Sequence, residues 1–505
     1  MPAHLYQQLS SRFPAREKTA FETQDGVRHS YGEVDAGAAR MAGALAALGV
    51  KPGGRVAVQV EKSLSAVLLY LGCARAGAVF LPLNTAYTPA EVEYFLTDAE
   101  PTVFVCDPKR RESLADAAKA AKVAHVETLD PSGHGSIVDR AAGMPATFAD
   151  AERGPDDLAA ILYTSGTTGR SKGAMITQEN LASNARALVE CWRFTDKDVL
   201  IHALPIYHTH GLFVAINTLM MAGGCMIFLP KFDADQVMSY MPRATSLMGV
   251  PTFYTRLLQH KGLTKDATAH MRLFVSGSAP LLAETHREFF SRTGHMILER
   301  YGMTETNMIT SNPYEGERVP GAVGFPLPGV SLRVADPETG AHLAQGEIGM
   351  IEVKGPNVFK GYWRMPDKTK AEFRADGYFI TGDLGMIDRR GYTHIVGRGK
   401  DLVITGGFNV YPKEIETEID GMPGVIESAV IGVPHPDFGE GVTAVVVRAK
   451  GAGISETDIS AALEGKLAKF KQPKKIFFVD DLPRNTMGKV QKNLLRDQYK
   501  TIYGG

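Results

Sequence analysis

The sequence predicts an α/β protein in which a large N-terminal domain of several layers is followed by a small α+β domain. Three observations lead to this prediction. The chain has 505 residues, which is more than one hydrophobic core usually organises. Apolar, strand-like runs alternate with helical patterns from about Arg55 onwards, and this pattern changes after about Gly397. Hydrophobic residues make up 44% of the chain and charged residues 22%, which is typical of a globular protein.

The first part of the chain carries the alternation that builds parallel sheets. Strands separated by helices predict a largely parallel sheet covered by helices on both faces. The predicted strands are Arg55–Val60, Val79–Leu83, Thr102–Cys106, Leu200–Leu204, Met226–Leu229 and Leu273–Val275, and the predicted helices are Leu64–Ala74, Pro89–Thr97, Ala234–Tyr240 and Leu282–Arg292. The uncharged stretch Val199–Pro230 is interrupted by Pro205 and by Gly223–Gly224, so it predicts two buried strands, a loop and a helix rather than a membrane span.

The C-terminal part has the element order of a small α+β domain of about 100 residues. The expected elements are a helix at Pro412–Ile419, strands at Glu427–Ile431 and Val442–Arg448, a helix at Glu456–Phe470, a strand at Lys475–Phe478 and a helix at Val490–Tyr499. The glycine-rich, charged segment Gly397–Asp401 joins the two parts. We therefore expect a large domain over residues 1–397, a hinge over 398–402 and a small domain over 403–505.

Charge and cysteine content exclude several classes of function. The formal net charge is -1 and the pI is near 6.9, whereas a general nucleic-acid or membrane-surface binder is usually more basic. The four cysteines show no C-x-x-C pair and no metal-binding spacing, which favours reduced thiols in a cytoplasmic protein. The first residues show no basic segment followed by an apolar run, so no signal peptide is expected.

The strongest local signal is the glycine- and hydroxyl-rich segment Tyr163–Gly173, which follows the apolar run Leu158–Leu162. Glycines let backbone N–H groups approach a polyphosphate, hydroxyls add donors, and Arg170 and Lys172 add positive charge. The Walker pattern G-x-x-x-x-G-K-[ST] is absent, which disfavours a P-loop kinase or ATPase. For a generic segment of this composition, a flexible surface loop is the alternative interpretation.

The segment resembles the phosphate loop of the acyl-adenylate-forming enzymes, a superfamily that includes acyl-CoA synthetases, firefly luciferase and the adenylation domains of peptide synthetases. The resemblance covers nearly the whole chain, with the motifs in the family's order. One departure is Ser171, where the family usually has proline. The resemblance implies that the loop binds ATP through Thr164, Ser165, Gly166, Thr167, Thr168, Gly169 and Lys172.

Two further motifs extend the implied nucleotide site. The resemblance implies that the turn after a strand at Ser276, Gly277, Ser278 and Ala279 lines the adenine pocket. In the segment Glu299–Thr306, it implies that the ring of Tyr301 stacks on adenine, that Thr304 touches the α-phosphate and that Glu305 holds Mg²⁺. Mg²⁺ uses one or two carboxylates together with phosphates, so this chemistry is consistent. The implied ATP-binding residues in this second motif are Glu299, Arg300, Tyr301, Gly302 and Met303.

The remaining motifs concern the ribose, the hinge and catalysis. By resemblance, Asp383 in Thr381-Gly382-Asp383 grips the ribose hydroxyls, Arg398 contacts the ribose, and Lys400 lies at the hinge. The segment Pro483–Val490 resembles the family's catalytic-lysine motif, which makes Lys489 a catalytic residue beside Thr304 and Glu305. A compact charge on a flexible stem suits a residue that a moving domain delivers.

These residues imply a reaction in two steps. A carboxylate attacks ATP, pyrophosphate leaves, and the acyl-adenylate then acylates the thiol of CoA, with Mg²⁺ and Lys489 offsetting the repulsion between the two anions. In the resembled family the small domain is mobile and rotates about the hinge between the steps. Gly406, Gly407 and Phe408 then line the tunnel for the pantetheine arm of CoA.

The acid that is activated is harder to predict. The pocket should be lined by Pro205–Gly211 and Gly249–Arg256, which supply His208 and Arg256. A buried guanidinium without an acidic partner is costly, so Arg256 would await a second carboxylate; the alternative is an arginine that faces solvent on a helix. The strings Ile201–Phe213, Gly249–Leu258 and Lys354–Pro366 resemble malonyl-CoA synthetases, which implies malonate, with methylmalonate as a near neighbour.

Other functions stay open at this level. They are a CoA ligase for another short acid such as acetate or oxalate, a luciferase-like oxidase, an adenylation module that loads a carrier protein, and a non-catalytic nucleotide sensor. The expected partners are the small molecules malonate, ATP and CoA, without nucleic acid or membrane. Related synthetases are switched off by acetylation of the catalytic lysine, so Lys489 is a candidate site for a lysine acetyltransferase and deacetylase.

Overall fold

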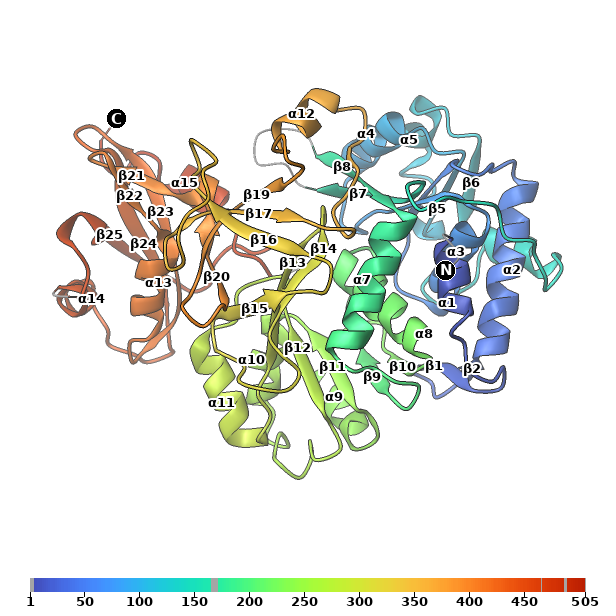
Figure 1. Cartoon of the computed structure of the whole chain (residues 1–505), viewed down its shortest axis with the longest axis horizontal. Helices are drawn as coiled ribbons and strands as arrows, with labels where there is room; N and C mark the ends of the chain where they lie inside the picture. The colour runs from blue at the N-terminus through green and yellow to red at the C-terminus, as the bar shows by residue number, and fades with distance from the viewer. Residues whose placement is uncertain (1–3, 165–170, 465, 486–487, 505) are drawn as a thin grey trace.

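The computed structural model describes residues 4–164, 171–464, 466–485 and 488–504. It consists of a large N-terminal domain built on two sheets and a small C-terminal domain, drawn in red, built on a third sheet (Figure 1). The chain passes from the large domain to the small one after strand β20 (Thr393–Arg398), through the short 3-10 helix η4 (Gly399–Asp401) to strand β21 (Val403–Thr405). The change of sheet falls within the glycine-rich segment that the sequence singles out.

The first sheet of the large domain has seven strands in the order β18-β8-β7-β4-β3-β5-β6. β7, β4, β3, β5 and β6 run parallel, while β8 and β18 add an antiparallel edge. The strands are β3 (Arg55–Gln59), β4 (Val79–Pro82), β5 (Val103–Cys106), β6 (His125–Thr128), β7 (Leu158–Thr164), β8 (Lys172–Thr177) and β18 (Gly361–Tyr362). Crossover helices α3 (Leu64–Arg75) and α4 (Pro89–Ala99) lie where the hydrophobic periodicity predicts them.

The second sheet is only partly parallel, which corrects the expectation of a largely parallel sheet. Its thirteen strands follow the order β16-β17-β19-β20-β15-β14-β13-β12-β11-β9-β10-β1-β2, and the strands from β13 to β1 run parallel. The parallel strands are β1 (Thr19–Thr23), β9 (Val199–His202), β10 (Cys225–Phe228), β11 (Ser246–Gly249), β12 (Leu273–Ser276) and β13 (Leu298–Met303). The other strands are antiparallel: β2 (Arg28–Ser30), β14 (Asn307–Ser311), β15 (Ala322–Pro326), β16 (Ser331–Ala335), β17 (Gly349–Lys354), β19 (Phe379–Ile387) and β20.

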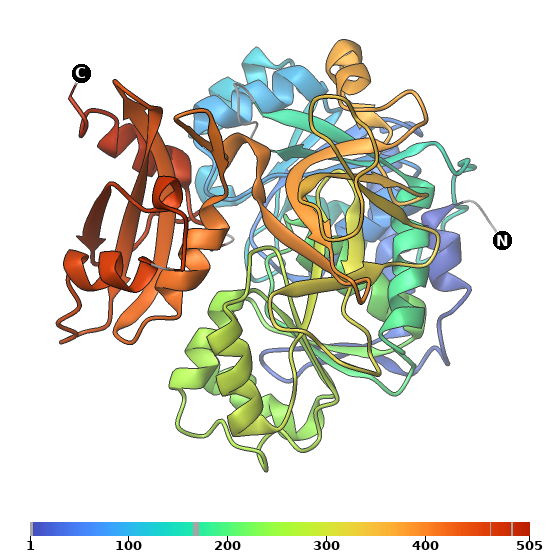
Figure 2. The same ribbon diagram turned by 60° about the vertical axis from the view of Figure 1, so that its left-hand side comes forward.

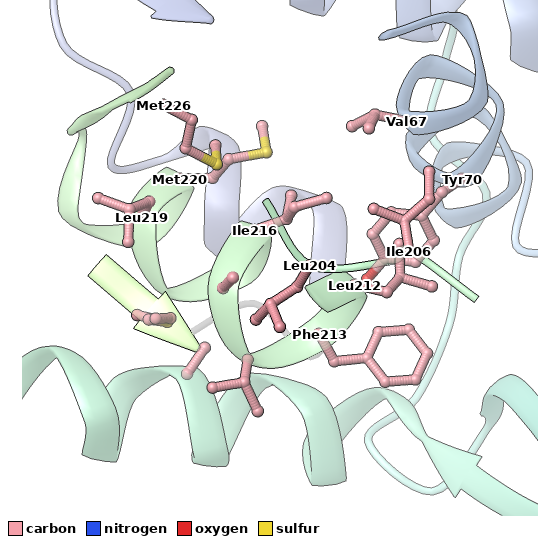
Figure 3. Close-up of a cluster of buried hydrophobic side chains, with 14 of the residues drawn as sticks. Val67, Tyr70, Leu204, Ile206, Leu212, Phe213, Ile216, Leu219, Met220 and Met226 are labelled. Carbon is pink, nitrogen blue, oxygen red and sulfur yellow. The ribbon is translucent and has the colours of Figure 1, made fainter. Parts of the chain in front are cut away.

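The main hydrophobic core lies against these sheets. It includes the uncharged stretch, which forms β9, the π-helix η2 (His210–Asn217), helix α8 (Thr218–Ala222) and β10, with η2 as an element that the sequence did not predict. Figure 3 shows Leu212 and Phe213 of η2 near Tyr70 of α3, and the rings of Tyr70 and Phe213 are 5.8 Å apart. None of the described helices is both long and apolar enough to cross a membrane.

The remaining helices of the large domain cover its sheets. They are α1 (Leu5–Ser10), α2 (Tyr31–Ala47), α5 (Ala115–Ala120), α6 (Ser136–Ala142), α7 (Gln178–Cys191), α9 (Ala234–Tyr240), α10 (Pro251–Gln259), α11 (Ala283–Thr293) and α12 (Pro366–Ala371), with the 3-10 helices η1 (Pro108–Arg110) and η3 (Met241–Arg243). α9 has the bounds that its periodicity predicts.

The small domain is α+β, as the sequence predicts. Its sheet has the order β22-β21-β24-β23, with β25 paired to β24, and helices pack against it (Figure 2). The elements after β21 are β22 (Phe408–Val410), α13 (Pro412–Asp420), β23 (Val425–His435), β24 (Gly439–Arg448), α14 (Glu456–Leu463), η5 (Lys469–Lys471), β25 (Lys475–Val479) and α15 (Lys492–Tyr499). The helix expected over Glu456–Phe470 was too long, because α14 ends at Leu463 and only the short turn η5 follows.

Candidate functional site

The phosphate-binding segment connects β7 to β8 at an edge of the first sheet. Thr164 ends β7 and Lys172 begins β8, and the two residues are paired across the antiparallel ladder. The strand-to-loop position that the sequence predicts is therefore confirmed. The predicted ATP-binding residues Ser165, Gly166, Thr167, Thr168 and Gly169 lie outside the described residues.

The proposed metal carboxylate lies in a tight turn between β13 and β14. A Cβ at Gly302 would lie 2.0 Å from the carbonyl oxygen of Asn307, so the approach of the two strands requires glycine there. The turn places Thr304 at the partly exposed tip and buries Glu305, whose Oε1 lies 3.0 Å from the Tyr362 hydroxyl oxygen. Burial raises the pKa of Glu305 above its ordinary value.

Mg²⁺ fits this arrangement as an ion that arrives with ATP. Within the described residues, no cluster of three or more His, Cys, Asp or Glu side chains is arranged to hold a metal ion. Glu305 offers a buried carboxylate, and Mg²⁺ commonly takes one or two carboxylates and completes its shell with phosphate oxygens and water. A nucleotide is therefore needed to complete the metal site.

Three residues of the proposed ribose and adenine site are in direct contact. Asp383 on β19 is opposite Arg398 on β20, and the Arg398 Nε lies 2.7 Å from Asp383 Oδ1. The Tyr301 hydroxyl donates to Asp383 Oδ2 at 2.5 Å. Asp383 is 3% exposed, and the Arg398 guanidinium neutralises its charge. The role of these residues in ribose binding stays a prediction.

The turn after β12 carries small side chains. Ser276 is buried and its hydroxyl has no hydrogen-bond partner in the described part of the chain, and Ser278 has a positive φ of 71°. An unpaired buried donor and a strained backbone are typical of a ligand site. Two other predicted ATP-binding residues, Ala279 and Met303, are partly exposed. Glu299 is instead buried, and its carboxylate already accepts a hydrogen bond from the Gly321 N–H at 3.0 Å.

Lys489, in the small domain, lies within electrostatic reach of charged residues of the large domain. A Cβ at Gly488 would lie 3.4 Å from the Thr252 side chain on α10 of the large domain, so the loop is in contact with the large domain. Burial, and then the positive charge of Arg398, lower the pKa of Lys489 to about 8, and the charges of Asp383 and Arg300 also act on it. The ammonium therefore lies among the residues predicted to bind ATP.

The turn after β12 packs against a buried cation, the guanidinium of Arg300. Arg300 is 4% exposed, and its Nε and Nη2 have no hydrogen-bond partner among the described residues. Burial lowers the pKa of Arg300 to about 9. The guanidinium packs on Gly277, where a Cβ would lie 2.4 Å from Cζ of Arg300. Such an unpaired cation is costly, which indicates a site for an anion.

His208 lies within electrostatic reach of this cation and is a neutral donor. Burial, followed by the charges of Lys489 and Arg300, lowers the pKa of His208 to about 3. The Nδ1 of His208 accepts the backbone N–H of His210 at 3.3 Å, so the proton of the neutral ring is on Nε2. The His210 ring is also buried, and its Nδ1 lies 3.3 Å from the Ser278 hydroxyl. The histidines thus add hydrogen bonding near Arg300 without adding charge.

The expectation of a buried Arg256 was wrong. Arg256 lies on the exposed face of α10, the alternative that the sequence left open, because the buried face of this helix is occupied by Phe253, Tyr254 and Leu257. The buried, unpaired guanidinium is that of Arg300, which the sequence assigned only to the nucleotide. Its isolation depends on packing against Gly277 and on the lack of a hydrogen-bond partner for Nε and Nη2 among the described residues, and neither feature is visible along the sequence.

The residues predicted to act in the second step lie in the small domain. Gly406 and Gly407, with positive φ of 57° and 82°, form the turn between β21 and β22. The glycines suit this hairpin, whose turn needs left-handed backbone at both positions. Phe408 is 55% exposed and stacks on Phe470 at 4.6 Å. Lys400 is exposed in η4, at the change of sheet. The tunnel and hinge roles of these residues stay predictions.

Comparisons with known proteins give a consistent result. The model of the AMP-binding enzyme family matches residues 7–363, and that of the AMP-binding enzyme C-terminal domain matches residues 414–489. Curated relatives include a mitochondrial malonate–CoA ligase from Mus musculus, 36% identical over 88% of this chain and 82% of its own length, and a feruloyl-CoA synthase from an Amycolatopsis species, 36% identical over 96% and 98%.

Two solved structures of MatB from Rhodopseudomonas palustris cover the whole of this chain and are covered fully by it. The ATP-bound form is 67% identical with a TM-score of 0.98, and the apo form is 68% identical with a TM-score of 0.87. Since the two forms are almost equally identical to this chain, the difference in TM-score reflects conformation. The arrangement of this chain is therefore more similar to the ATP-bound form.

Proposed function

The chain belongs to the AMP-binding enzyme family, and on that premise we propose that it is an ATP-dependent malonate–CoA ligase. The reaction would convert malonate, ATP and CoA into malonyl-CoA, AMP and pyrophosphate through a malonyl-adenylate. The observation that carries this proposal is that a lysine of the small domain lies within electrostatic reach of a buried carboxylate, Glu305, and of a buried unpaired guanidinium, Arg300.

The nucleotide half of the proposed site has the charges that adenylation needs. Glu305 would hold Mg²⁺ beside the phosphates, and the ion would supply charge neutralisation at the α-phosphate. Thr304 and Lys172 would contact phosphate oxygens, while Asp383 and Arg398 would bind the ribose. Lys489 would bridge the attacking carboxylate and the α-phosphate, where its ammonium stabilises the charge that develops as pyrophosphate leaves.

The acyl half of the proposed site selects a second carboxylate. The Arg300 guanidinium supplies a full charge and two unpaired N–H groups, and His208 supplies a neutral Nε2–H donor. A monocarboxylate would leave the guanidinium unpaired, whereas malonate would place its distal carboxylate there and its reacting carboxylate toward Lys489. The relatives named as malonate–CoA ligases support this choice, while the equally identical feruloyl-CoA synthase shows that overall identity does not determine the acid.

A panel of acids tests the proposal. Purified protein is incubated with ATP, Mg²⁺, CoA and malonate, methylmalonate, oxalate, acetate or ferulate, and AMP and the thioester are measured together. The proposal expects the highest kcat/KM for malonate, with methylmalonate nearest to it, because one methyl group changes discrimination by only about 1–3 kcal/mol. A preference for acetate or oxalate would favour the other short-acid ligases, and absence of AMP with every acid would revive the nucleotide sensor.

The same experiment separates the non-ligase alternatives. A luciferase-like oxidase or a carrier-loading module would activate the acid with ATP but would form no CoA thioester. We also propose that the enzyme works in the cytoplasm, which is supported by the four free cysteines and by the need for ATP and CoA. Lys489 is the proposed target of a lysine acetyltransferase and a deacetylase, because its charge is needed only for the first step.

A further inference from the structure

A polar chain links the phosphate-loop lysine to the proposed metal carboxylate. Glu372, which follows α12, lies with its Oε1 3.3 Å from Lys172 Nζ and 2.8 Å from Lys368 Nζ. The Tyr362 hydroxyl lies 2.6 Å from Glu372 Oε2 and 3.0 Å from Glu305 Oε1. Lys172 Nζ is also 4.2 Å from the centre of the Tyr362 ring. Glu372 belongs to none of the motifs that the sequence singles out, and Tyr362 lies in the string Lys354–Pro366, where no individual residue has a role predicted from the sequence.

The fold brings these residues together from distant parts of the chain. β18, which carries Tyr362, pairs with β8, which begins at Lys172, and α12 follows β18 directly. Figure 1 labels β8 and α12. The side chains of Lys172 and Glu372 are each 19% exposed. A largely buried ammonium needs an anion, and Glu372 supplies one where the phosphate-binding segment enters β8.

The Glu372 carboxylate is a negatively charged partner of Lys172 that a phosphate group could replace. Burial opposes its ionisation, but hydrogen bonds from Lys368 and Tyr362 and the charge of Lys172 hold its pKa below the ordinary value. Of the three groups that surround the carboxylate, Lys172 is the most distant, at 3.3 Å against 2.8 and 2.6 Å. Lys172 is therefore the partner released at least cost, and Lys368 and Tyr362 keep Glu372 satisfied after its release.

We propose that Glu372 is a positioning residue of the nucleotide site that holds Lys172 beside Tyr362 until the phosphates of ATP take the lysine over. This inference rests on the proposed function, because it assumes that ATP binds at Lys172. The exchange breaks the ion pair between Lys172 and Glu372 and forms one between Lys172 and phosphate. Glu372 thus competes with ATP, and Lys368 moderates the competition by sharing the carboxylate.

Binding of ATP and AMP to the full-length protein tests this exchange without turnover. Calorimetry is carried out with Mg²⁺ and without acid or CoA, on wild type, Glu372→Gln, Lys368→Met and Lys370→Met. Partly exposed ion pairs contribute at most about 1 kcal/mol, so we expect changes of about two- to fivefold. Glu372→Gln should tighten ATP binding, because it removes the carboxylate that competes with phosphate for Lys172. Lys368→Met should weaken ATP binding, because the Glu372 carboxylate then pairs more strongly with Lys172.

Two controls separate this exchange from general electrostatics. Lys370→Met removes the same charge from the same helix at an exposed position, and it should leave ATP binding unchanged. AMP lacks the β- and γ-phosphates, so its affinity should not follow the changes seen with ATP. In the Lys172→Met background, Glu372→Gln should no longer change the ratio of ATP to AMP affinity, since an effect that acts through Lys172 disappears with it.

The outcomes distinguish this inference from the function on which it rests. If Lys172→Met leaves ATP affinity unchanged, the phosphates do not lie at Lys172 and the nucleotide assignment fails as well. If Lys172→Met weakens ATP binding but Glu372→Gln leaves it unchanged or weakens it, only the exchange is overturned. Persistence of the Glu372→Gln effect without Lys172 also overturns it. Should thermal melting show that Glu372→Gln is unfolded, the ATP affinities of Lys368→Met and Lys370→Met are compared instead. Weaker binding by Lys368→Met alone supports the exchange, and equal affinities overturn it.

Discussion

Replacement of Arg300 by methionine should abolish the preference for a dicarboxylate. The guanidinium is 4% exposed, and two of its N–H-bearing nitrogens lack partners within the described residues. When malonate binds, its distal carboxylate would pair with this cation in a buried pocket. Truncation of one partner of such a pair costs about 2–5 kcal/mol, since the other charge stays buried and unpaired. The kcat/KM for malonate should therefore fall by about 30- to 5,000-fold.

A monocarboxylate should respond in the opposite sense. Propionate has no distal charge, so Arg300→Met should leave its kcat/KM unchanged or raise it as the pocket becomes apolar. The variant should also melt no earlier than wild type, because the substitution removes an unsatisfied buried cation. Arg256→Met is the matched control: Arg256 is exposed on α10, and its replacement should change activity with either acid by less than about threefold.

The assay for this prediction is continuous pyrophosphate release at saturating ATP, with malonate and propionate measured on the same preparations. An equal loss with both acids would show that Arg300 serves the nucleotide or the fold rather than the distal carboxylate. A larger loss for Arg256→Met than for Arg300→Met would return the role to Arg256 and would refute the argument from burial.

Three further predictions follow from the site. Because Lys489 has a pKa of about 8, its ammonium is about nine-tenths populated at pH 7 and about one-tenth at pH 9. The kcat/KM for adenylation should therefore fall as the pH rises through about 8, and a profile that is flat to pH 9.5 would contradict this. Protein that carries acetyl-lysine at position 489 should lose adenylation but still transfer a supplied malonyl-adenylate to CoA, and loss of both steps would count against the assignment. Gly302→Ala should lower the melting temperature by an amount equivalent to about 1–3 kcal/mol, since its Cβ would lie 2.0 Å from the Asn307 carbonyl oxygen, and an unchanged melting temperature would show that the strands can separate there.

Elements with a strong apolar signal could be predicted from the sequence. Strand β3 and helix α9 lie where their hydrophobic patterns place them, because burial decides these patterns locally. The antiparallel strands β14 to β20 could not be predicted in the same way, since their pairing depends on turns and on bulges that shift the register. The helix expected to reach Phe470 ended early for a similar reason, as packing rather than periodicity determines where α14 stops.

The residues of the candidate site could also be predicted only in part. Asp383 and Arg398 could be found as motif residues, and the structure adds that they face each other on adjacent strands. Arg300 could be found only as part of a nucleotide motif, because its lack of partners is a property of the folded pocket. Glu372 lies 200 positions from Lys172, and nothing in the local sequence indicates that the two side chains meet.

Single-turnover formation of malonyl-adenylate by Lys489→Ala tests the central claim most directly, namely that an ammonium from the small domain enables the acid to attack ATP. Loss of one preorganised electrostatic donor typically costs a factor of about 100–1,000. Adenylate formation should fall by at least this factor, while thioester formation from supplied malonyl-adenylate stays within about threefold of wild type. Adenylate formation at the wild-type rate would contradict the account, whatever the position of Lys489 in the structure.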